Sequence, residues 1–408
     1  MTFEAYGADW RLFESGAQCG GLSQSIVQDG FTWDLGGHVG FSRSQAYNLL
    51  MDDLLGAESW IWHDRRAAAL VGGQTVAYPV QHNEDQLPDQ AATEGDQTHA
   101  DPASFEGWMR RQFSARVIEQ FLLPYNRKLW NIEPAAMSSV WVGDRVAKSN
   151  TGSDEAWGPN RRFRYPARGG TGAPWSALAS RLPSARISNG VAFEELDTRL
   201  RTVKMSDGSA CSYDVLISTI PLTTLIDRTP SLASLSLGGA IENTSVGLCG
   251  FGFRGSPPPV LSDLDWLYCA EPELDCYRLT VLSRYSPHNA PPGHWSLLCE
   301  SGGADGFVPQ PAEGLLRALG ERGLCDPSVL ATTWTHYLRH GYPIPTLQRD
   351  AVLRDVHTRL EHEHVFSRGR FGGWRYEVSN QDHSFLQGSE VAHRIMRGLP
   401  ETTLWAAG

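Results

Sequence analysis

The chain has 408 residues and a formal charge of −11 at pH 7, with charged residues making up 20% of it. This acidic balance argues against a nucleic-acid-binding protein, which would carry a basic face. No apolar run is long enough to cross a bilayer and the first residues lack a signal-peptide pattern, so we expect a cytoplasmic protein with no membrane partner. A chain of this length is expected to form two or three interlocked domains.

Cysteine and histidine usage gives no indication of a metal centre. The cysteines are odd in number and scattered, without a Cys-x-x-Cys pair, so neither a zinc site nor a disulfide framework is predicted. His362 and His364 alternate with Glu363 in a polar stretch, which is typical of solvated side chains. The seven cysteines, expected to be free thiols, are Cys19, Cys211, Cys249, Cys269, Cys276, Cys299 and Cys325.

The first predicted strand covers residues 10–14 and ends in an acid, Glu14. In a dinucleotide-binding fold an acid at this place accepts hydrogen bonds from ribose hydroxyls, although a strand-ending glutamate is also common without that role. The G-x-G-x-x-G turn of such folds lies about 20 residues before the acid. Only thirteen residues precede Glu14 and Gly7 is their one glycine, so the turn is absent. We expect residues 1–6 to end a helix and the chain to begin inside a βαβ unit.

Glycine-rich stretches follow in three places. Glycine permits positive φ angles and close approach of the backbone to a ligand, and a glycine loop at a helix start offers N–H groups to an anion. A plain turn explains each stretch as well, so each is a weak signal. The stretches are Cys19-Gly20-Gly21-Leu22, then Gly36-Gly37-His38 after a strand ending in Asp34, and Arg168-Gly169-Gly170-Thr171-Gly172 before a helix predicted over residues 174–182.

The remaining elements alternate between helical and strand patterns. Residues 86–103 are polar and predict a surface loop, and residues 105–123 have the apolar spacing of a helical subdomain. Residues 193–219 predict a hairpin that turns at Asp207-Gly208 and leads into an apolar strand at 215–217. Several strands are predicted within residues 246–300, including 266–268 and 277–281.

Polar residues accompany two tryptophans at helical spacing. Asn126 lies four residues before Trp130, and Trp141 lies four before Arg145. The tryptophans also suit a core, but their polar partners favour a binding face.

The densest polar-aromatic stretch lies near the C-terminal end. Its content of Arg, Tyr and Asn favours a ligand site over a structural network. No side-chain nucleophile with a base is visible in the chain, which suits chemistry carried by a cofactor. The stretch runs Arg370-Phe371-Gly372-Gly373-Trp374-Arg375-Tyr376 and continues with Asn380-Gln381-Asp382-His383.

Taken together, the motifs resemble the UDP-galactopyranose mutase family, in particular its eukaryotic branch, within the FAD-dependent amine oxidase superfamily. Many flavoproteins share the glycine stretches, and far fewer share the whole ordered series. The series comprises residues 30–38, 77–81 (Ala-Tyr-Pro-Val-Gln), 124–130 (Pro-Tyr-Asn-Arg-Lys-Leu-Trp), 141–147, 157–160, 163–172, 340–343 (His-Gly-Tyr-Pro) and 370–383.

The resemblance implies an α/β fold of several domains. A Rossmann-like FAD-binding domain lacking its first strand and phosphate loop is joined by a helical subdomain and an antiparallel sheet domain. The expected divisions are residues 1–64, 184–244 and 346–408 for the FAD-binding domain, 84–150 for the helical uridine-binding subdomain, and 65–83, 151–183 and 245–345 for the sheet domain.

The resemblance also implies an isomerase that interconverts UDP-galactopyranose and UDP-galactofuranose. In this family reduced FAD attacks the anomeric carbon and expels UDP. The covalent flavin N5–sugar adduct opens and recloses as the other ring, and UDP recaptures the sugar without net redox change. A flavin nucleophile agrees with the absence of a catalytic side chain.

Residue roles are implied by motif position. The residues expected to take part directly in the reaction are Gly37, His38, Arg145, Arg278 and Asn160, with Arg145 and Arg278 clamping the diphosphate. The residues expected to bind substrate are Tyr78, Gln81, Tyr125, Asn126 and Trp130 around the uridine, Trp266 and Tyr268 around the sugar, and Tyr342, Tyr376 and Asn380 around the diphosphate. The residues expected near FAD are Glu14, Gly20, Gly21, Gly36, Gly37, His38, Arg65, Arg370, Asn380 and Gln381.

Two positions depart from the family pattern. Val80 stands where a larger aromatic residue is usual beside the uracil, so the base or sugar preference could differ. Ser379 replaces a glycine before Asn380, which could shift the backbone there. The absent phosphate-binding turn puts FAD binding itself in question and indicates a misassigned start or a truncated chain.

Three alternatives stay open. The chain could act on another nucleotide sugar in specialised metabolism, could be an amine-oxidase-like redox enzyme, or could be a flavin-less binding protein for sugar nucleotides. NAD(P)H as the flavin reductant and assembly into a homo-oligomer are also left open.

Overall fold

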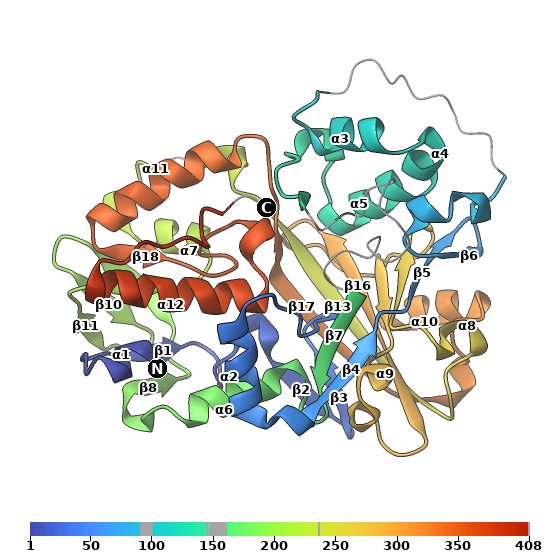
Figure 1. Cartoon of the computed structure of the whole chain (residues 1–408), viewed down its shortest axis with the longest axis horizontal. Coiled ribbons are helices and arrows are strands. Elements are labelled where there is room, and N and C mark those ends of the chain that lie inside the picture. The colour runs from blue at the N-terminus through green and yellow to red at the C-terminus, as the bar shows by residue number, and fades with distance from the viewer. Residues whose placement is uncertain (90–100, 144–145, 147–160, 236, 407–408) are drawn as a thin grey trace.

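The computed structural model describes residues 1–89, 101–143, 146, 161–235 and 237–406, and it has two lobes that lie side by side (Figure 1). One lobe is built on a seven-stranded sheet with a helical subdomain at its end, and the other on short parallel strands between helices. This mixed α/β architecture of several sheets confirms the predicted fold class.

The large sheet has the strand order β17-β13-β16-β15-β14-β5-β6. Neighbouring strands are antiparallel except β14 and β5, which run parallel, so the predicted antiparallel sheet is corrected to a mixed one. A parallel pair needs a long crossover, and the helical subdomain lies in the chain between these two strands. The strands are β5 (Ala67–Val71), β6 (Gln74–Ala77), β13 (Asn243–Arg254), β14 (Trp266–Cys269), β15 (Arg278–Thr280), β16 (His294–Gly303) and β17 (Leu330–Pro343).

Helices cover the sheet lobe at its end and along one side (Figure 1). The helical pattern predicted for residues 105–123 is confirmed, and the helices continue to Trp130. It begins where the Ser104 hydroxyl caps the first turn by accepting from the Gly107 N–H at 3.0 Å. Residues 90–100 of the predicted surface loop lie outside the described residues. The helices of this lobe are α3 (Phe105–Gln112), α4 (Ala115–Val117), a π-helical turn (Ile118–Leu122), α5 (Leu123–Trp130), α8 (Pro259–Ser262), α9 (Leu282–Tyr285) and α10 (Ala312–Glu321).

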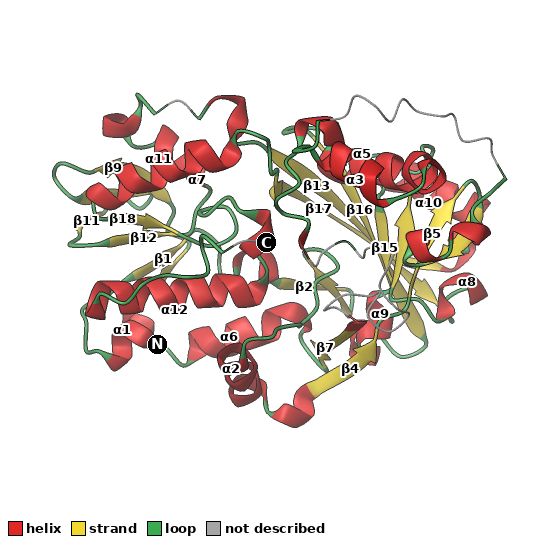
Figure 2. Ribbon diagram, turned by 45° about the horizontal axis from the view of Figure 1, so that its top comes forward, coloured by secondary structure: helices red, strands yellow, loops and turns green. Residues whose placement is uncertain are grey.

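The other lobe holds two pairs of parallel strands, β1 with β8 and β12 with β18. Helix α12 lies on one side of these strands and α11 with α7 on the other (Figure 2). The predicted hairpin with its turn at Asp207-Gly208 is confirmed as part of a three-stranded sheet, β11-β10-β9. The elements are α1 (Thr2–Ala5), β1 (Leu12–Glu14), β8 (Ile187–Asn189), β9 (Phe193–Asp197), β10 (Thr202–Met205), β11 (Ala210–Ser212), β12 (Leu216–Ser218), α7 (Leu222–Asp227), α11 (Arg349–His362), β18 (Val365–Ser367) and α12 (Gln381–Arg397).

Two short strand pairs and two helices complete the fold between the lobes. They are the hairpin of β2 (Ser25–Gln28) and β3 (Phe31–Asp34), the pair of β4 (Trp60–Asp64) and β7 (Arg162–Pro166), and helices α2 (Gln45–Leu55) and α6 (Ala173–Ser180). Tyr47 of α2 packs on Trp175 of α6 with ring centroids 6.4 Å apart. Residues 162–180 therefore pack against the first chain segment. The predicted domain division stays a prediction.

Buried Asp34 holds these pieces together. Its carboxylate accepts hydrogen bonds from the Ser25 hydroxyl at 2.5 Å, the Tyr165 hydroxyl at 2.7 Å and the Thr171 N–H at 3.1 Å. Burial raises the pKa of Asp34, and the three donors act in the opposite direction. Gly170, at φ +65°, passes so close that a Cβ would collide with Ser25 and Asp34. The third glycine stretch thus donates to the protein's own carboxylate.

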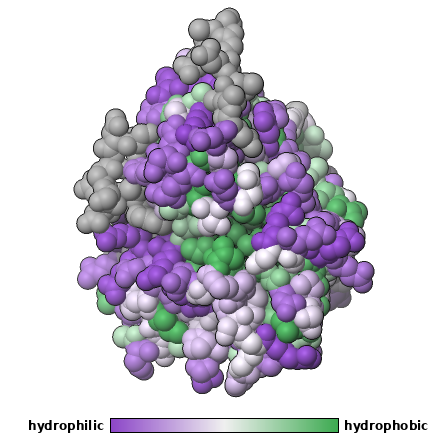
Figure 3. Space-filling view, turned by 90° about the vertical axis from the view of Figure 1, so that its right-hand side faces the viewer, coloured by the Kyte–Doolittle hydropathy of each residue, from purple (hydrophilic) through white to green (hydrophobic). Residues whose placement is uncertain are grey.

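The end of the sheet lobe presents a mainly hydrophilic surface around a small apolar hollow (Figure 3). Within the described part of the chain, no helix is both long and apolar enough to traverse a bilayer. All seven cysteines lie in described segments and are free thiols, five of them buried, as predicted.

Removal of the Asp34 carboxylate tests its structural role. Asp34→Ala leaves three donors without their acceptor, and we expect the free energy of unfolding to fall by roughly 3 kcal/mol or more. Asp34→Asn keeps one acceptor oxygen of the same shape, so the expected loss is about 1–2 kcal/mol. Urea unfolding of both variants measures the difference, and equal losses below about 0.5 kcal/mol would contradict this role.

Candidate active site

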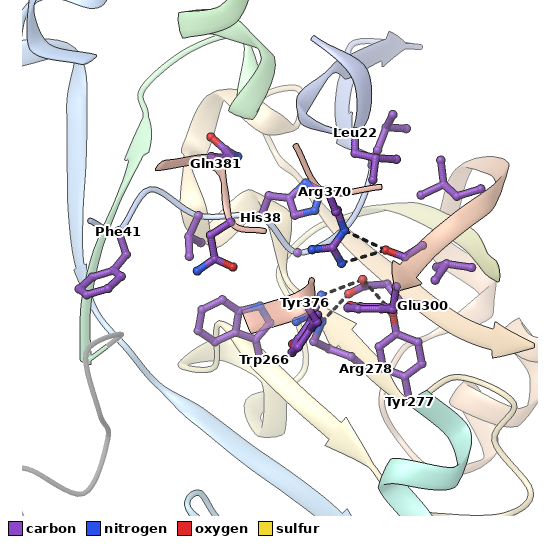
Figure 4. Close-up of a pocket in the computed structure, with 18 of the residues that line it drawn as sticks. Leu22, His38, Phe41, Trp266, Tyr277, Arg278, Glu300, Arg370, Tyr376 and Gln381 are labelled. Atoms are coloured by element: carbon purple, nitrogen blue, oxygen red, sulfur yellow. Dashed lines mark hydrogen bonds and ion pairs between the residues drawn. The ribbon is translucent and has the colours of Figure 1, made fainter. Parts of the chain in front are cut away.

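A cavity of about 220 Å³ lies between the two lobes. Strands β13 to β17 of the large sheet form one wall, and the loop after β3, with Gly37 and His38, crosses this wall. The segment leading into α12 supplies Arg370, Tyr376 and Gln381 from the other lobe (Figure 4). The wall is therefore assembled from segments far apart in the sequence.

An ion pair occupies the sheet side of the cavity. Arg278 of β15 donates through Nε to Glu300 Oε2 at 2.5 Å and through Nη2 to Glu300 Oε1 at 2.8 Å. The two residues are direct cross-strand partners on β15 and β16. Glu300 is 2% exposed and Arg278 is 17% exposed, so the guanidinium keeps an accessible edge while one edge is bound. This geometry holds the Arg278 fork in one orientation.

Arg370 lies across the cavity from this pair (Figure 4). Its Nε and Nη2 donate to the Gly341 carbonyl at 3.1 and 2.8 Å, and its Nη1 donates to the Ser379 hydroxyl at 2.9 Å. Ser379 in turn donates to the Tyr376 carbonyl at 3.0 Å. The serine that departs from the family pattern thus ties Arg370 to the Tyr376 backbone.

His38 sits beside these arginines in its neutral form. Burial lowers the pKa of His38 to about 4, the negative charge of Glu300 acts in the opposite direction, and the charges of Arg370 and Arg278 lower it further. The His38 backbone N–H donates to the Gly36 carbonyl at 2.8 Å and closes a tight turn in which Gly36 has a φ of +133°. A neutral imidazole is consequently a hydrogen-bonding group and not a cation in this cavity.

The ionisable side chains of the wall carry a surplus of positive charge. Arg65, Arg278 and Arg370 face a single carboxylate, Glu300, which leaves two positive charges in excess among the described residues. Arg65 also donates to the Tyr268 hydroxyl at 2.7 Å and lies over the Trp266 ring at 5.0 Å. In a protein of net charge −11, a cavity with this surplus favours an anionic ligand.

The sequence predicted about half of the cavity wall. Two predicted residues, Arg145 and Asn160, lie outside the described residues. The predicted residues that line the cavity are Gly37, His38, Arg65, Trp266, Tyr268, Arg278, Tyr342, Arg370, Tyr376, Asn380 and Gln381. The residues that sequence reasoning missed are Leu22, Leu35, Val39, Phe41, Val246, Tyr277, Glu300, Leu338 and Gly341.

The predicted uridine residues form a second layer behind the wall. The rings of Tyr78 and Tyr125 lie 4.7 and 5.5 Å from that of Tyr268. Asn126 donates to the Leu122 carbonyl at 2.8 Å and accepts from Trp130 Nε1 at 3.1 Å, so their polar groups bond within the helical subdomain. Val80, 0% exposed, packs in the core, and Gln81 follows it in a short 3₁₀ turn.

The residues predicted near the dinucleotide lie at the end of β1 and in the loop that follows. Glu14 accepts from the Gly16 N–H at 2.7 Å. Gly20 and Gly21 have φ angles of +133° and +52°, which favour glycine, and they lead directly to Leu22 on the cavity wall. Gly36 borders the cavity, because a Cβ there would lie 3.3 Å from Glu300 Oε1.

Glu300 is the missed residue with the clearest signal in the sequence. It directly follows an apolar run, Leu297-Leu298-Cys299, that predicts a buried strand. A charged residue that continues such a strand has to be paired, and it therefore marks a site. Tyr277 carries no such signal, since it resembles any aromatic residue of a buried strand.

Comparison with known proteins agrees with this geometry. The family described as flavin containing amine oxidoreductase matches residues 5–321. A crystal structure of reduced UDP-galactopyranose mutase superposes with a TM-score of 0.89 at 34% sequence identity, covering 100% of this chain and 93% of that one. The chain belongs to the UDP-galactopyranose mutase family. This family lies within the flavin-containing amine oxidoreductases and supports a flavin-dependent enzyme.

More distant structures share the fold with this mutase-family chain. Cyclohexylamine oxidase from Brevibacterium oxydans IH-35A has a TM-score of 0.66 at 12% identity and covers 97% of this chain and 95% of its own. A CLA-producing fatty acid isomerase from P. acnes has a TM-score of 0.65 at 14% identity, and the match covers 97% of this chain and 94% of the isomerase chain. At such identities the likeness concerns the fold alone.

No metal site accompanies the cavity in the described segments. No three His, Cys, Asp or Glu side chains within them come together as metal ligands would.

The protonation state of His38 can be measured directly. Because burial lowers its pKa to about 4, we expect the imidazole to stay neutral at pH 6, where a solvated histidine with a pKa of about 6.5 is mostly charged. NMR titration of histidine-labelled protein, with the resonance assigned through His38→Asn, measures the midpoint. A midpoint above about 6 would show that His38 is solvated.

Proposed function

We propose that the chain is a flavin-dependent isomerase that interconverts the pyranose and furanose forms of a UDP-sugar, with UDP-galactose as the substrate. The observation that carries the proposal is the surplus of two positive charges among the described residues that line an aromatic cavity. A diphosphate that joins uridine to a sugar carries two negative charges and matches this surplus. The 34% identity to a UDP-galactopyranose mutase over the full chain supports the same substrate class.

The described residues fit the ring system of FAD. His38 Nδ1 and Trp266 Nε1 are buried polar atoms of the wall without a hydrogen-bond partner in the described residues, and a ring with polar edges could supply such partners. We assign Gly37, His38, Arg65, Arg370, Asn380 and Gln381 to the ring, and Glu14, Gly20, Gly21 and Gly36 to the rest of the dinucleotide. Reduced FAD, when bound, supplies the nucleophile that the side chains lack.

The remaining predicted residues are assigned to the substrate. Arg278 with Arg145, Tyr342, Tyr376 and Asn380 would bind the diphosphate. Tyr78, Gln81, Tyr125, Asn126 and Trp130 would form the uridine end, either directly or by fixing the wall, and Trp266, Tyr268 and Asn160 would surround the sugar.

The side chains contribute charge control and exclusion of water. When the bond between the sugar and UDP breaks, negative charge grows on the diphosphate, and the held fork of Arg278 stabilises it. Positive charge grows at the anomeric carbon, where a neutral His38 adds no repulsion. The aromatic wall around Trp266 and Tyr376 keeps water from capturing the sugar.

The alternatives make different demands on the same cavity. A surplus of positive charge repels an ammonium substrate, which disfavours an amine oxidase. The alternative that the enzyme acts on another nucleotide sugar is tested by assaying UDP-galactose, UDP-arabinose and dTDP-sugars side by side. An absorption spectrum of the purified chain tests for bound flavin, and a colourless folded protein that binds UDP would be a binding protein without flavin.

The proposed activity is tested with chemically reduced, FAD-loaded protein. We expect the reduced protein to convert UDP-galactofuranose to UDP-galactopyranose and the oxidised protein to convert none. Chromatography of the nucleotide sugars measures the conversion. Absence of conversion by reduced protein with flavin bound would refute the proposal.

A conservative substitution tests the role of Arg278. Arg278→Lys keeps the charge but loses the fork, so we expect kcat/KM to fall by about 10- to 100-fold. The matched control is Arg339→Lys, since Arg339 has a 67% exposed side chain paired with Asp305 away from the cavity. Equal activities for the two variants would remove Arg278 from the proposed site.

A further inference from the structure

Glu300 places a negative charge in a cavity that is otherwise suited to anions. Its side chain is 2% exposed and lines the cavity, and it is the one acidic residue among the described lining residues. A carboxylate is unfavourable beside a diphosphate, because like charges repel most strongly where water is scarce. Its function therefore needs an explanation beyond ligand attraction.

Three contacts hold this carboxylate in place. Both oxygens accept from Arg278, and Oε1 also lies 3.3 Å from the Tyr277 hydroxyl. The Tyr277 backbone N–H donates to the Glu300 carbonyl at 2.8 Å. Tyr277 itself is 0% exposed and packed, so Glu300 cannot turn away when an anion binds.

Arg278 fixes how close the two negative groups come. One edge of its planar guanidinium is bound to Glu300, and only the remaining edge can bind another oxygen. Oxygens on two edges of one guanidinium lie roughly 6–7 Å apart, given hydrogen bonds of about 2.8 Å on each side. Over this distance near a protein surface, one unit of charge changes binding by on the order of 10- to 100-fold.

The charge of the ligand changes during the proposed reaction, on which this inference rests. A UDP-sugar carries about two negative charges, whereas free UDP carries about three above pH 7 because its terminal phosphate is a monoester. When the bond between the anomeric carbon and the phosphate oxygen breaks, its electron pair stays on that oxygen. The additional charge therefore appears on the phosphate that Arg278 is assigned to bind.

We infer that Glu300 is a specificity-determining residue that makes the site discriminate against free UDP in favour of the UDP-sugar. Its fixed negative charge acts more strongly on the trianion than on the dianion. During turnover the same repulsion raises the free energy of the released phosphate oxygen and favours its return to the sugar. The carboxylate thus limits both trapping of UDP by the protein and loss of the sugar.

The test compares two dissociation constants for each variant. Isothermal titration calorimetry of the full chain with oxidised FAD measures Kd for UDP and for UDP-galactose at pH 8. Oxidised FAD is used because it leaves the sugar unconverted during the titration. In Glu300→Gln we expect the affinity for UDP, relative to that for UDP-galactose, to rise about 10- to 100-fold above the wild-type ratio. The ratio of the two constants is the readout, because a displaced Arg278 would weaken both ligands and the trianion UDP more, which moves the ratio in the opposite direction.

Three further variants separate charge from position. Glu300→Asp keeps the charge and should leave the ratio within about 2-fold of the wild type, even if both constants rise. Glu271→Gln removes the charge of another buried carboxylate, which accepts from the Gly73 N–H outside the cavity wall, and should not move the ratio. Leu338→Glu adds a carboxylate to the wall without touching the Arg278 pair, and it should shift the ratio in the opposite direction.

The outcomes are distinct. The inference is supported if the ratio of Kd for UDP to Kd for UDP-galactose changes in opposite directions in Glu300→Gln and Leu338→Glu. The same ratio must stay unchanged in the two controls, Glu300→Asp and Glu271→Gln. If Glu300→Gln does not fold, an unchanged ratio in Leu338→Glu overturns it. An unchanged ratio in Glu300→Gln with both ligands weakened makes Glu300 only a support for Arg278. Wild-type protein that binds neither ligand would refute the proposed function itself.

Discussion

The fold depends on one buried carboxylate. Asp34 ends β3, and its three donors come from β2, from β7 and from the glycine turn before α6. A charged group at 0% exposure is tolerated only when its oxygens are fully bonded. The segments that carry Ser25, Tyr165 and Thr171 must therefore meet at one point. The loop from Leu35 to His38 begins immediately after that point, which sets where the cavity wall starts.

Aromatic packing fixes the same strand against the large sheet. The ring of Trp33 lies on β13, where a Cβ at Gly250 would come within 2.7 Å of it, and Gly252 leaves similar room for Phe31. Trp33 also stacks on Trp334 of β17 with ring centroids 5.8 Å apart and planes 2° from parallel. Two glycines in a buried strand thus allow β3 to lie flat on the sheet. Asp34 and these rings together keep His38 in register with Arg278 and Glu300.

The sequence predicted elements well where a local pattern decides them. The helical subdomain, the turn at Asp207-Gly208 and the strand pattern around Arg278 follow from periodicity and turn residues. Motif resemblance added the family and much of the cavity wall. Neither source revealed that β5 and β14 run parallel, because strand direction depends on the intervening chain.

The missed parts of the site depend on partners distant in sequence. The bond from the Thr171 N–H to Asp34 cannot be seen in the glycine stretch, which looked like an anion-binding loop. Asn126 and Trp130 looked like a binding face, yet they bond to each other. Ser379 looked like a disturbance, and its hydroxyl instead positions Arg370. In each case the side chain's role is set by a tertiary contact that spacing alone does not encode.

The pairing of β4 with β7 and the bonds to Asp34 have a consequence for the order of folding. Residues 60–64 pair with residues 162–166, and the Asp34 carboxylate takes two of its donors from Tyr165 and Thr171. During synthesis, the first segment emerges long before these partners exist, so the Asp34 carboxylate must stay hydrated and β4 unpaired, whereas β2 and β3 can already pair with each other. Contacts of such sequence separation close slowly. The growing chain accordingly leaves the rings of β3 exposed for a long time, which makes this segment dependent on protection from aggregation.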